Sequence, residues 1–382
     1  TAEVTVQVSG KSVTEMNAEN GSTWAFPFRK EKGMVDFSVQ LPPSGSKLLF
    51  ISSKNKKGKS PKTFGAKELF PAGETAVTTV TPNILTLDYL ELTMGKFRNE
   101  PLYFYAADNE IWKHHGFPDN PWSASVQFKT RLADADTFAV GSGFTVCYPF
   151  IVDDNFELAN VQLVVERPNL YQISVNGQPV QELENKYWLD PDFRIFEIGQ
   201  IIKKGRNEVV LTASPFSMYC ETEPLYLLGN FAVLPQEKGW KLANAQPLAT
   251  GAWKNQGMPF YGQTVSYTKK VQVKVESRFL IELPEWKGTV AEVLVDGKHQ
   301  GIIFLKPYEL EVSIPYGIHE ITVNITGSNK NTLGPHHNYT TPGIVSPGSF
   351  RTAPQIQPSG ESYDLLDYGL MQDFLVYELK KI

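Results

Sequence analysis

The sequence has few of the features that indicate a metal site, a disulfide scaffold or a membrane span. Among its 382 residues are only two cysteines, Cys147 and Cys220, which match no metal-ligand spacing. Both lie in strand-like sequence, which favours two buried free thiols over a disulfide. No hydrophobic run approaches the roughly 20 residues of a membrane-spanning helix, so a membrane is not an expected partner.

An excess of positive charge is also missing. The formal net charge is −5, whereas a protein that binds nucleic acid needs a clustered basic face for the phosphates. The one basic run, Lys54–Lys59, is interrupted by asparagine and glycine and has no aromatic stacking platform beside it. We therefore expect a solvated loop there and no nucleic-acid partner.

The third absence is a sustained helical period bounded by caps. Alternation with period two is common instead, as in Val35–Leu41, Asn83–Leu92 and Phe144–Val152. Residues Gly95–Gln127 follow neither pattern, and we expect a long irregular excursion there, of a kind that is often functional. The prediction is an all-β fold with few or no long helices.

The clearest β-module lies in Tyr171–Val233. Apolar residues alternate with polar ones up to Asn176-Gly177, the pair that is typical of a two-residue type I′ hairpin. The same order of strand and turn returns at Val293–Gly297 and Tyr316–Val323. We therefore predict two copies of one β-module, at residues 73–237 and 238–382, behind a small or partial β-domain at residues 1–72.

The order of these short motifs resembles that of the galactose-binding-like jelly-roll modules that accompany glycoside hydrolases of family 2 and the large α-L-rhamnosidase-like enzymes. The resemblance covers most of the chain, and no single motif is specific. It rests on the following segments: Val175–Gly177, Trp188–Asp190, Gly205–Val209, Tyr226–Phe231, Trp253, Gly257–Gly262, Asn331–His337 and Asp367–Leu370. It implies tandem jelly-roll β-sandwiches.

Such enzymes carry their catalytic carboxylates on a barrel, and this sequence has neither βαβ alternation nor a set of long helices. The resemblance therefore implies a C-terminal accessory region, whose partner is an upstream catalytic domain of the same polypeptide. It also implies secretion to a periplasm or cell surface. The chain opens on TAEVTVQVSG, without methionine or a signal peptide, which agrees with a processed protein or a fragment.

A sugar-binding surface needs exposed aromatic rings that stack on pyranose faces, beside polar groups that bond hydroxyls. Two regions offer this combination, the excursion and, less strongly, a cluster in the third unit. The candidate carbohydrate-binding residues are Tyr103, Tyr105, Trp112, Trp122, Asp119 and Asn120 in the excursion, and Trp286 and Tyr308 in the third unit. The alternative, which we favour, is that the excursion's rings form its own small core and that the other pair is ordinary packing.

Three further groups were weighed for chemistry. Adjacent His336 and His337 on an extended chain point to opposite faces, which favours structural loop histidines over a metal site. Asp153–Glu157 offers oxygen ligands for a structural calcium ion, but the spacing matches no defined loop, so a solvated turn is favoured and no cofactor is expected. The acids that invite pairing for glycoside hydrolysis are Glu166, Glu182, Glu221, Glu223 and Glu285.

Three functions stay open on this basis. The first is a set of non-catalytic carbohydrate-binding or structural modules of a glycoside hydrolase that acts on complex polysaccharide. The second is a catalytically active β-sandwich hydrolase or lyase whose acids meet at a domain interface. The third is a set of purely structural modules that pack on an absent barrel. The expected ligand in the first two cases is an oligo- or polysaccharide.

Overall fold

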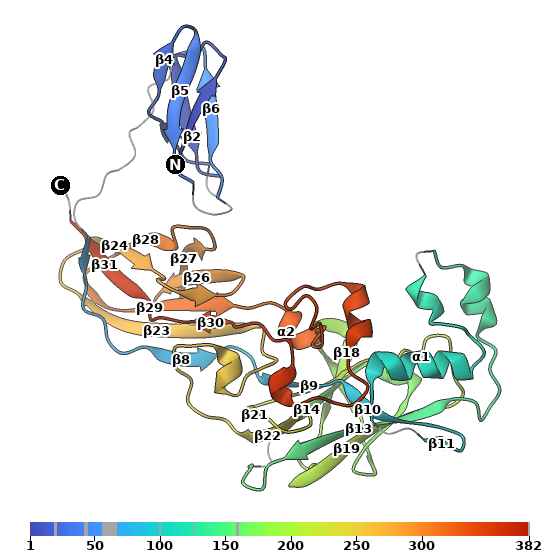
Figure 1. The fold of residues 1–382 in the computed structure, drawn as a ribbon. Helices are drawn as coiled ribbons and strands as arrows, with labels where there is room; N and C mark the ends of the chain where they lie inside the picture. Colours follow the sequence, from blue (N-terminus) through green and yellow to red (C-terminus); the bar gives the residue numbers. More distant parts are fainter. Residues whose placement is uncertain are drawn as a thin grey trace.

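The computed structural model describes residues 1–18, 21–41, 45–55, 67–98, 101–124, 126–157 and 160–380. The chain is built mainly of strands, nearly all of them paired antiparallel, which confirms the all-β prediction. Figure 1 shows a small N-terminal unit and two larger β-sandwiches side by side. We call the sandwich with strands between residues 83 and 244 the first sandwich, and its neighbour, with most strands between residues 264 and 379, the second sandwich.

The N-terminal unit consists of two small sheets around its own core. Its strands, in sheet order, are β1 (Ala2–Val6), β5 (Met34–Val39) and β4 (Arg29–Glu31), and then β3 (Thr23–Ala25), β2 (Ser12–Met16) and β6 (Leu48–Ser52). Val13, Val35, Phe37 and Val39 form this core, which is separate from the single core that runs through both sandwiches. Most of the basic run Lys54–Lys59 lies outside the described residues.

The first sandwich packs a nine-stranded sheet on a five-stranded one. The larger sheet runs β11 (Phe97–Arg98), β10 (Tyr89–Met94), β13 (Phe144–Val152), β19 (Gly205–Ala213), β15 (Gln172–Val175) and β16 (Gln178–Pro179), with β12 (Leu102–Tyr103), β21 (Phe231–Pro235) and β22 (Trp240–Asn244) attached. The smaller sheet runs β17 (Glu182–Trp188), β18 (Asp190–Glu197), β14 (Gln162–Glu166), β20 (Leu225–Gly229) and β9 (Asn83–Leu87).

The second sandwich packs a five-stranded sheet on a four-stranded one. The first runs β27 (Lys298–Ile303), β26 (Val290–Val295), β29 (Gly317–Thr326), β23 (Thr264–Val273) and β8 (Ala76–Thr79). The other runs β28 (Glu309–Ile314), β24 (Ser277–Glu282), β31 (Leu375–Leu379) and β7 (Lys67–Leu69), and a short ladder joins β25 (Trp286–Lys287) to β30 (Gly369–Leu370).

Both sandwiches have the same strand order. The series β13, β19, β15, β16 in the first corresponds to β23, β29, β26, β27 in the second, and β18, β14, β20, β9 corresponds to β28, β24, β31, β7. The two hairpins expected at Asn176-Gly177 and Asp296-Gly297 form at equivalent places, with φ of 50° and 78° in one and 49° and 73° in the other. Positive φ at both central positions is what a type I′ turn requires.

The two copies are nested along the chain. Strands β7 and β8 precede the first sandwich in sequence, yet β7 pairs with β31 and β8 with β23 of the second sandwich. Strand β22, at Trp240–Asn244, pairs with β13 and β21 of the first. The first sandwich is therefore inserted between the second and third strands of the second sandwich. Strand β7 lies before the predicted boundary at residue 72 and β22 lies after the one at residue 237, yet each pairs with strands on the other side of that boundary.

Helix α1 (Phe104–His114) is the main departure from the expectation of an irregular excursion. Its buried residues are Phe104, Ala107, Asp108, Ile111 and Trp112, a spacing that places them on one helical face. The helix has no side-chain cap and no acidic residue in its first turn, so the usual signals of a helix start are missing. Without these signals, the sequence does not predict this helix.

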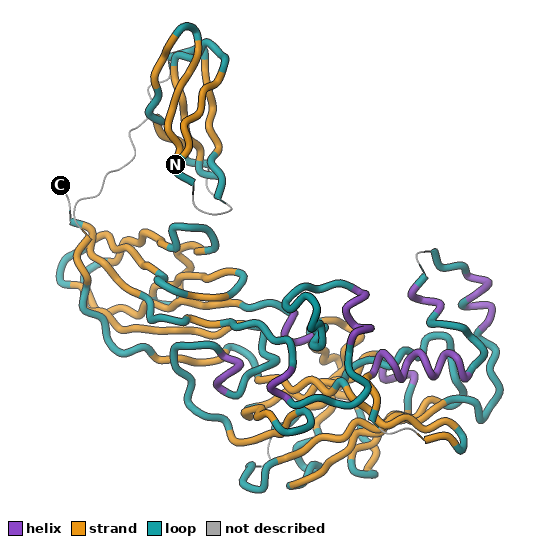
Figure 2. Tube along the Cα trace, viewed as in Figure 1, coloured by secondary structure: helices purple, strands orange, loops and turns teal. Residues whose placement is uncertain are grey.

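The other helices are short. They are α2 (Lys330–Leu333), η1 (Pro121–Ser123), η2 (Lys129–Arg131), η3 (Ala133–Ala135), η4 (Pro168–Leu170), η5 (Trp253–Gln256), η6 (Pro347–Thr352) and η7 (Gly360–Ser362). Figure 2 shows them mainly around the first sandwich and the joint between the two sandwiches. Within the described residues, none of the helices has the length and apolar character needed to cross a membrane.

Asp88 holds the two sandwiches together. The expected strand Asn83–Leu92 is in fact two strands, β9 and β10, which lie in opposite sheets, and Asp88 is the residue between them. Its carboxylate is 1% exposed and accepts hydrogen bonds from Tyr363 Oη at 2.9 Å and His337 Nε2 at 2.9 Å, both from the C-terminal part of the chain. A buried carboxylate with two donors links segments that are far apart in sequence.

Asp88→Ala is expected to destabilise both sandwiches together. The substitution leaves the buried His337 and Tyr363 donors without an acceptor, which costs about 3–5 kcal/mol. Urea unfolding followed by tryptophan fluorescence measures this loss, with Asp154→Ala on an exposed turn as the control. Equal midpoints for the two variants would show that Asp88 does not hold the joint.

Candidate functional site

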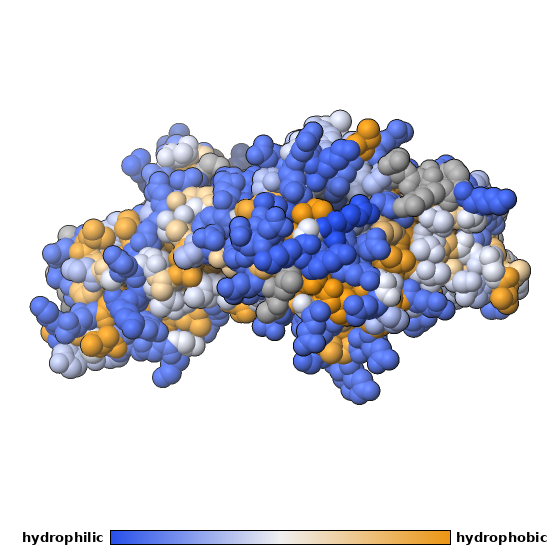
Figure 3. Space-filling view, turned by 90° about the horizontal axis from the view of Figure 1, so that it is seen from below, coloured by the Kyte–Doolittle hydropathy of each residue, from blue (hydrophilic) through white to orange (hydrophobic). Residues whose placement is uncertain are grey.

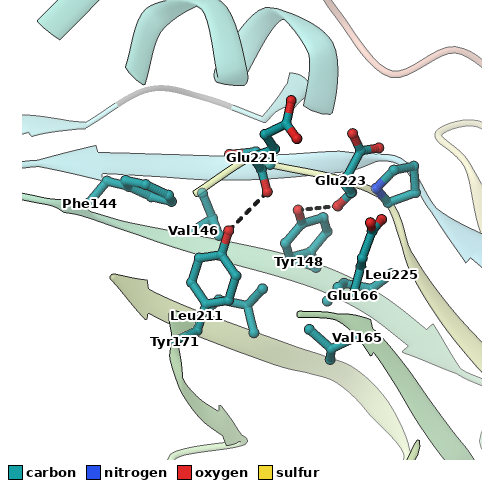
Figure 4. A pocket seen from close by; sticks show the side chains of 12 residues that line it. Phe144, Val146, Tyr148, Val165, Glu166, Tyr171, Leu211, Glu221, Glu223 and Leu225 are labelled. Carbon is teal, nitrogen blue, oxygen red and sulfur yellow. Dashed lines mark hydrogen bonds between the residues drawn. The ribbon is translucent and has the colours of Figure 1, made fainter. Parts of the chain in front are cut away.

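Three glutamates gather around a hollow in the first sandwich (Figure 4). Glu166 is the last residue of β14, whereas Glu221 and Glu223 lie in the segment that leads from β19 to β20. Thr222, between them, is buried at 4% exposure. In extended chain, residues two apart point to the same side. Figure 4 shows the carboxyl groups of Glu221 and Glu223 above the ring of Tyr148 and that of Glu166 beside this ring.

The segment that carries Glu221 and Glu223 is held from two directions. From the sheet below, Tyr148 Oη donates to the carbonyl of Glu223 at 2.6 Å and Tyr171 Oη donates to the carbonyl of Glu221 at 2.9 Å. From helix α1, Asp108 Oδ1 accepts the backbone N–H of Thr222 at 3.2 Å. These bonds satisfy the backbone of a segment that has no ladder partner, and they fix where its acidic side chains lie.

Asn120 connects two of the carboxylates. Its Nδ2 donates to Asp108 Oδ2 at 3.0 Å and to Glu221 Oε1 at 3.1 Å. On the other side, Arg167 lies 3.9 Å from Glu221 and donates to Asp192 at 3.2 Å. Hydrogen bonds thus join Asp108, Asn120 and Glu221, and Glu221 lines the same hollow as Glu166 and Glu223. We call these five residues the acidic site.

Burial and mutual repulsion shift the protonation of these acids. The pKa of Glu223 is raised well above its ordinary range, chiefly because the group is withdrawn from water and also because Glu166 and Glu221 are near. Burial likewise raises the pKa of Glu166. Burial raises the pKa of Asp108 to about 6, although the bonds from Thr222 and Asn120 oppose this shift. The protonated form of Glu223 is therefore favoured relative to that of a freely solvated glutamate.

The hollow itself is small, and aromatic rings lie close to it. It measures about 10 Å³, which is the size of a single water-sized group such as one hydroxyl. Thr222 Oγ1, which lines it, has no hydrogen-bond partner among the described residues. Trp122, two residues from Asn120, donates its indole N–H to the carbonyl of Met218 at 2.6 Å, and its ring lies 5.7 Å from that of the exposed Tyr219.

The predicted residues of the excursion divide into two sets. Tyr103 and Trp112 are buried at 3% and 0% exposure, and Trp112 packs edge-on against Phe117 and Phe216, so these two rings belong to the core that runs through both sandwiches. Trp122 and Asn120 belong to the acidic site or its rim.

The remaining predicted residues lie outside the acidic site. Asp119 is exposed, and the hydroxyl of Tyr105 accepts a bond from Arg351 Nε at 3.0 Å. In the second sandwich, the half-buried rings of Trp286 and Tyr308 meet edge to face at 5.4 Å.

The acids named from the sequence also divide. Glu166, Glu221 and Glu223 come together, whereas Glu182 pairs with Arg194 at 3.2 Å and Glu285 lies in the second sandwich, where its carboxylate accepts a bond from Gln372. Sequence reasoning missed Tyr219 and Arg167, although a local signal was present: Arg167 directly follows Glu166, and Tyr219 lies two residues before Glu221.

The two groups weighed as metal ligands have partners within the protein. Asp153 pairs with Lys241 at 2.5 Å, and His336 Nε2 bonds to the carbonyl of Asn331 at 2.8 Å. Burial lowers the pKa of His336 to about 4, which keeps the ring neutral. No group of three or more His, Cys, Asp or Glu side chains suited to a metal ion occurs within the described part of the chain.

Comparison with known proteins finds likeness only among solved structures. No family model matches the chain, and no curated protein matches it. A family 2 β-galacturonidase from Eisenbergiella tayi, bound to galacturonate, is 21% identical over 39% of this chain and 22% of its own, with a TM-score of 0.21.

Two other solved structures are similar over more of the chain. A β-D-mannosidase from Dictyoglomus thermophilum is 11% identical over 64% of this chain and 31% of its own, with a TM-score of 0.26. A rhamnosidase from Novosphingobium sp. PP1Y is 15% identical over 63% of this chain and 23% of its own, with a TM-score of 0.24. The chain thus spans less than a third of the length of each of these three glycoside hydrolases.

The raised pKa values predict that stability falls as pH rises. Folded Asp108 keeps its proton up to about pH 6, whereas the ordinary value is 3.8. The folded state therefore binds more protons between these values, and this group's contribution declines by up to about 3 kcal/mol as pH rises from 4 to 6. Asp108→Asn should flatten that decline, measured by urea unfolding at several pH values. Parallel curves for variant and wild type would contradict the assignment.

Proposed function

We propose that the chain is a set of non-catalytic modules of a glycoside hydrolase, and that its acidic site binds carbohydrate. The observation that carries the proposal is that a carboxyl cluster is bonded to Asn120, which in turn bonds the backbone of Trp122, whose half-buried ring lies beside an exposed tyrosine. The cluster is Glu166, Glu221 and Glu223, and the rings are Trp122 and Tyr219. These are the two kinds of group that sugar recognition uses, acceptors or donors for hydroxyls and flat apolar faces for the ring.

The geometry suits a sugar that lies across the rim. Because the hollow holds only one hydroxyl-sized group, a pyranose ring stays outside it and places one hydroxyl among the carboxyl groups. A carboxyl group donates a hydrogen bond when it is protonated and accepts hydrogen bonds from hydroxyls when it is ionised, so the cluster can offer both kinds of partner to a sugar.

The family resemblance implies what the rest of the protein is, what it acts on and where it is located. These are an upstream catalytic domain on the same polypeptide, a complex polysaccharide as the substrate of the whole protein, and secretion to a periplasm or cell surface. The interleaved sandwiches support an accessory role, because the shared core and the buried Asp88 joint make a rigid platform for a neighbouring domain.

A catalytic role is the second candidate, and one observation favours it. Glu223 has a strongly raised pKa and faces a second carboxyl, Glu166, across the hollow. Glycosidases pair a protonated carboxylic acid with a second carboxylate in this way. The third candidate, a purely structural set of modules, is favoured by the burial of Tyr103 and Trp112.

Removing the exposed ring should weaken carbohydrate binding. We expect Tyr219→Ala to lose up to about tenfold in affinity, since one stacked ring contributes about 0.5–1.5 kcal/mol. Affinity electrophoresis in gels that contain plant polysaccharides measures the change. Tyr316→Ala, at a tyrosine that is 77% exposed in the second sandwich, is the matched control. Unchanged migration of wild type in every polysaccharide would favour the structural candidate instead.

Turnover separates the first candidate from the second. We expect the chain to hydrolyse aryl glycosides and to cleave polysaccharides no faster than buffer, because the small hollow does not enclose a sugar. Glu223→Gln serves as the control for any residual rate. Turnover that Glu223→Gln abolishes would establish the catalytic candidate and reject the first.

A further inference from the structure

A larger groove lies at the seam of the two sandwiches, away from the acidic site. It measures about 590 Å³, within the range of small-molecule sites. Its walls come from five parts of the chain: residues 77–83 from β8 to the start of β9, residues 160 and 162 at the start of β14, the turn between β20 and β21, the segment 245–248 after β22, and residues 256 and 258 at the end of η5. Figure 3 views the molecule from below, where hydrophobic residues reach a mainly hydrophilic surface in several places.

The lining of this groove carries no charge. None of the twenty described residues that form it is Asp, Glu, Lys, Arg or His, although a fifth of the chain's residues are charged. Its polar groups are amides and hydroxyls, including those of Asn230, Gln246 and Thr79, which are exposed. Its apolar groups include Val80, which is 59% exposed, and the half-buried Leu248. An uncharged ligand rich in hydroxyls matches such a surface.

The walls are fixed before any ligand binds. Asn83, 5% exposed, donates to the carbonyls of Phe231 at 2.7 Å and Gly257 at 2.8 Å, which joins the β9 end to the opposite wall. Tyr261 of the second sandwich bonds through its hydroxyl to Thr81 at 2.8 Å and to the carbonyl of Thr264 at 2.8 Å. A preformed site loses little conformational entropy on binding.

We propose that this groove is a second carbohydrate site, which takes a neutral oligosaccharide. Asn230, Gln246 and Thr79 bond the hydroxyls, and the C–H face of a sugar lies on the aliphatic side chains of Val80 and Leu248, which here take the place of an exposed aromatic ring. An acidic sugar is disfavoured here, because none of the described residues that line the groove has a cationic side chain to pair with a carboxylate. The inference goes beyond the acidic site and does not depend on it, since the two sites share no residue.

The test places a charge in the groove. Val80→Arg places a long, charged side chain in the groove at a position that is already exposed. The matched control is Val275→Arg, at a valine that is 70% exposed and does not line the groove. The probes are neutral oligosaccharides of two to four glucose, galactose, mannose, xylose or rhamnose units, with trigalacturonate as the charged comparison. Binding is followed by isothermal titration calorimetry on the full chain, and thermal unfolding checks that each variant is folded.

We expect at least one neutral oligosaccharide to bind wild type and Val275→Arg equally, and Val80→Arg at least about tenfold more weakly. Gln246→Ala should weaken binding in the same direction, with Gln300→Ala on β27 as its control. Tyr219→Ala should leave this binding unchanged, which separates the groove from the acidic site. The proposal is overturned if Val80→Arg binds as wild type does, or if no neutral probe binds at about 10 mM.

Discussion

The buried carboxylate of Asp88 is the constraint on which the arrangement of the sandwiches depends. It lies where the chain passes from one sheet of the first sandwich to the other. Its two donors, His337 and Tyr363, lie 249 and 275 residues later in the sequence. A carboxylate at 1% exposure is tolerated only because both oxygens are bonded. The bond geometry therefore requires the C-terminal loops to pack on the first sandwich, and the two cores become one.

That joint explains why the nested order of the chain is stable. The short strands β7 and β8 belong to the second sandwich but come first in the sequence. The whole first sandwich follows them in the chain, before the next strand of the second sandwich, β23. Loop closure over so long an insertion costs little extra entropy, because the cost grows only with the logarithm of length. The pairing of β8 with β23 and the Asp88 bonds hold the two ends together, and the uncharged groove is the surface left between them.

The acidic site stands in contrast, since its charges act against stability. Burial and mutual repulsion raise the pKa values of Asp108, Glu166 and Glu223 together. Neutral residues at these positions would make the fold more stable. Acids with strongly shifted pKa values in a partly open site are common where proteins bind ligands or catalyse reactions. The tyrosine and Asn120 bonds that hold Glu221 and Glu223 in place support the same view.

By itself the sequence determined the all-β class, the two type I′ hairpins and the repeated strand order, because alternation and turn residues act over a few neighbouring positions. It also named Glu166, Glu221, Glu223, Asn120 and Trp122 without showing that they meet. Only the tertiary structure decided that Asn83–Leu92 is two strands, that β7 and β8 complete the second sandwich, and that Trp112 is core while Trp122 is at a rim. Those outcomes depend on packing between segments that are far apart in the chain, and a local sequence pattern does not show which distant segments pack together.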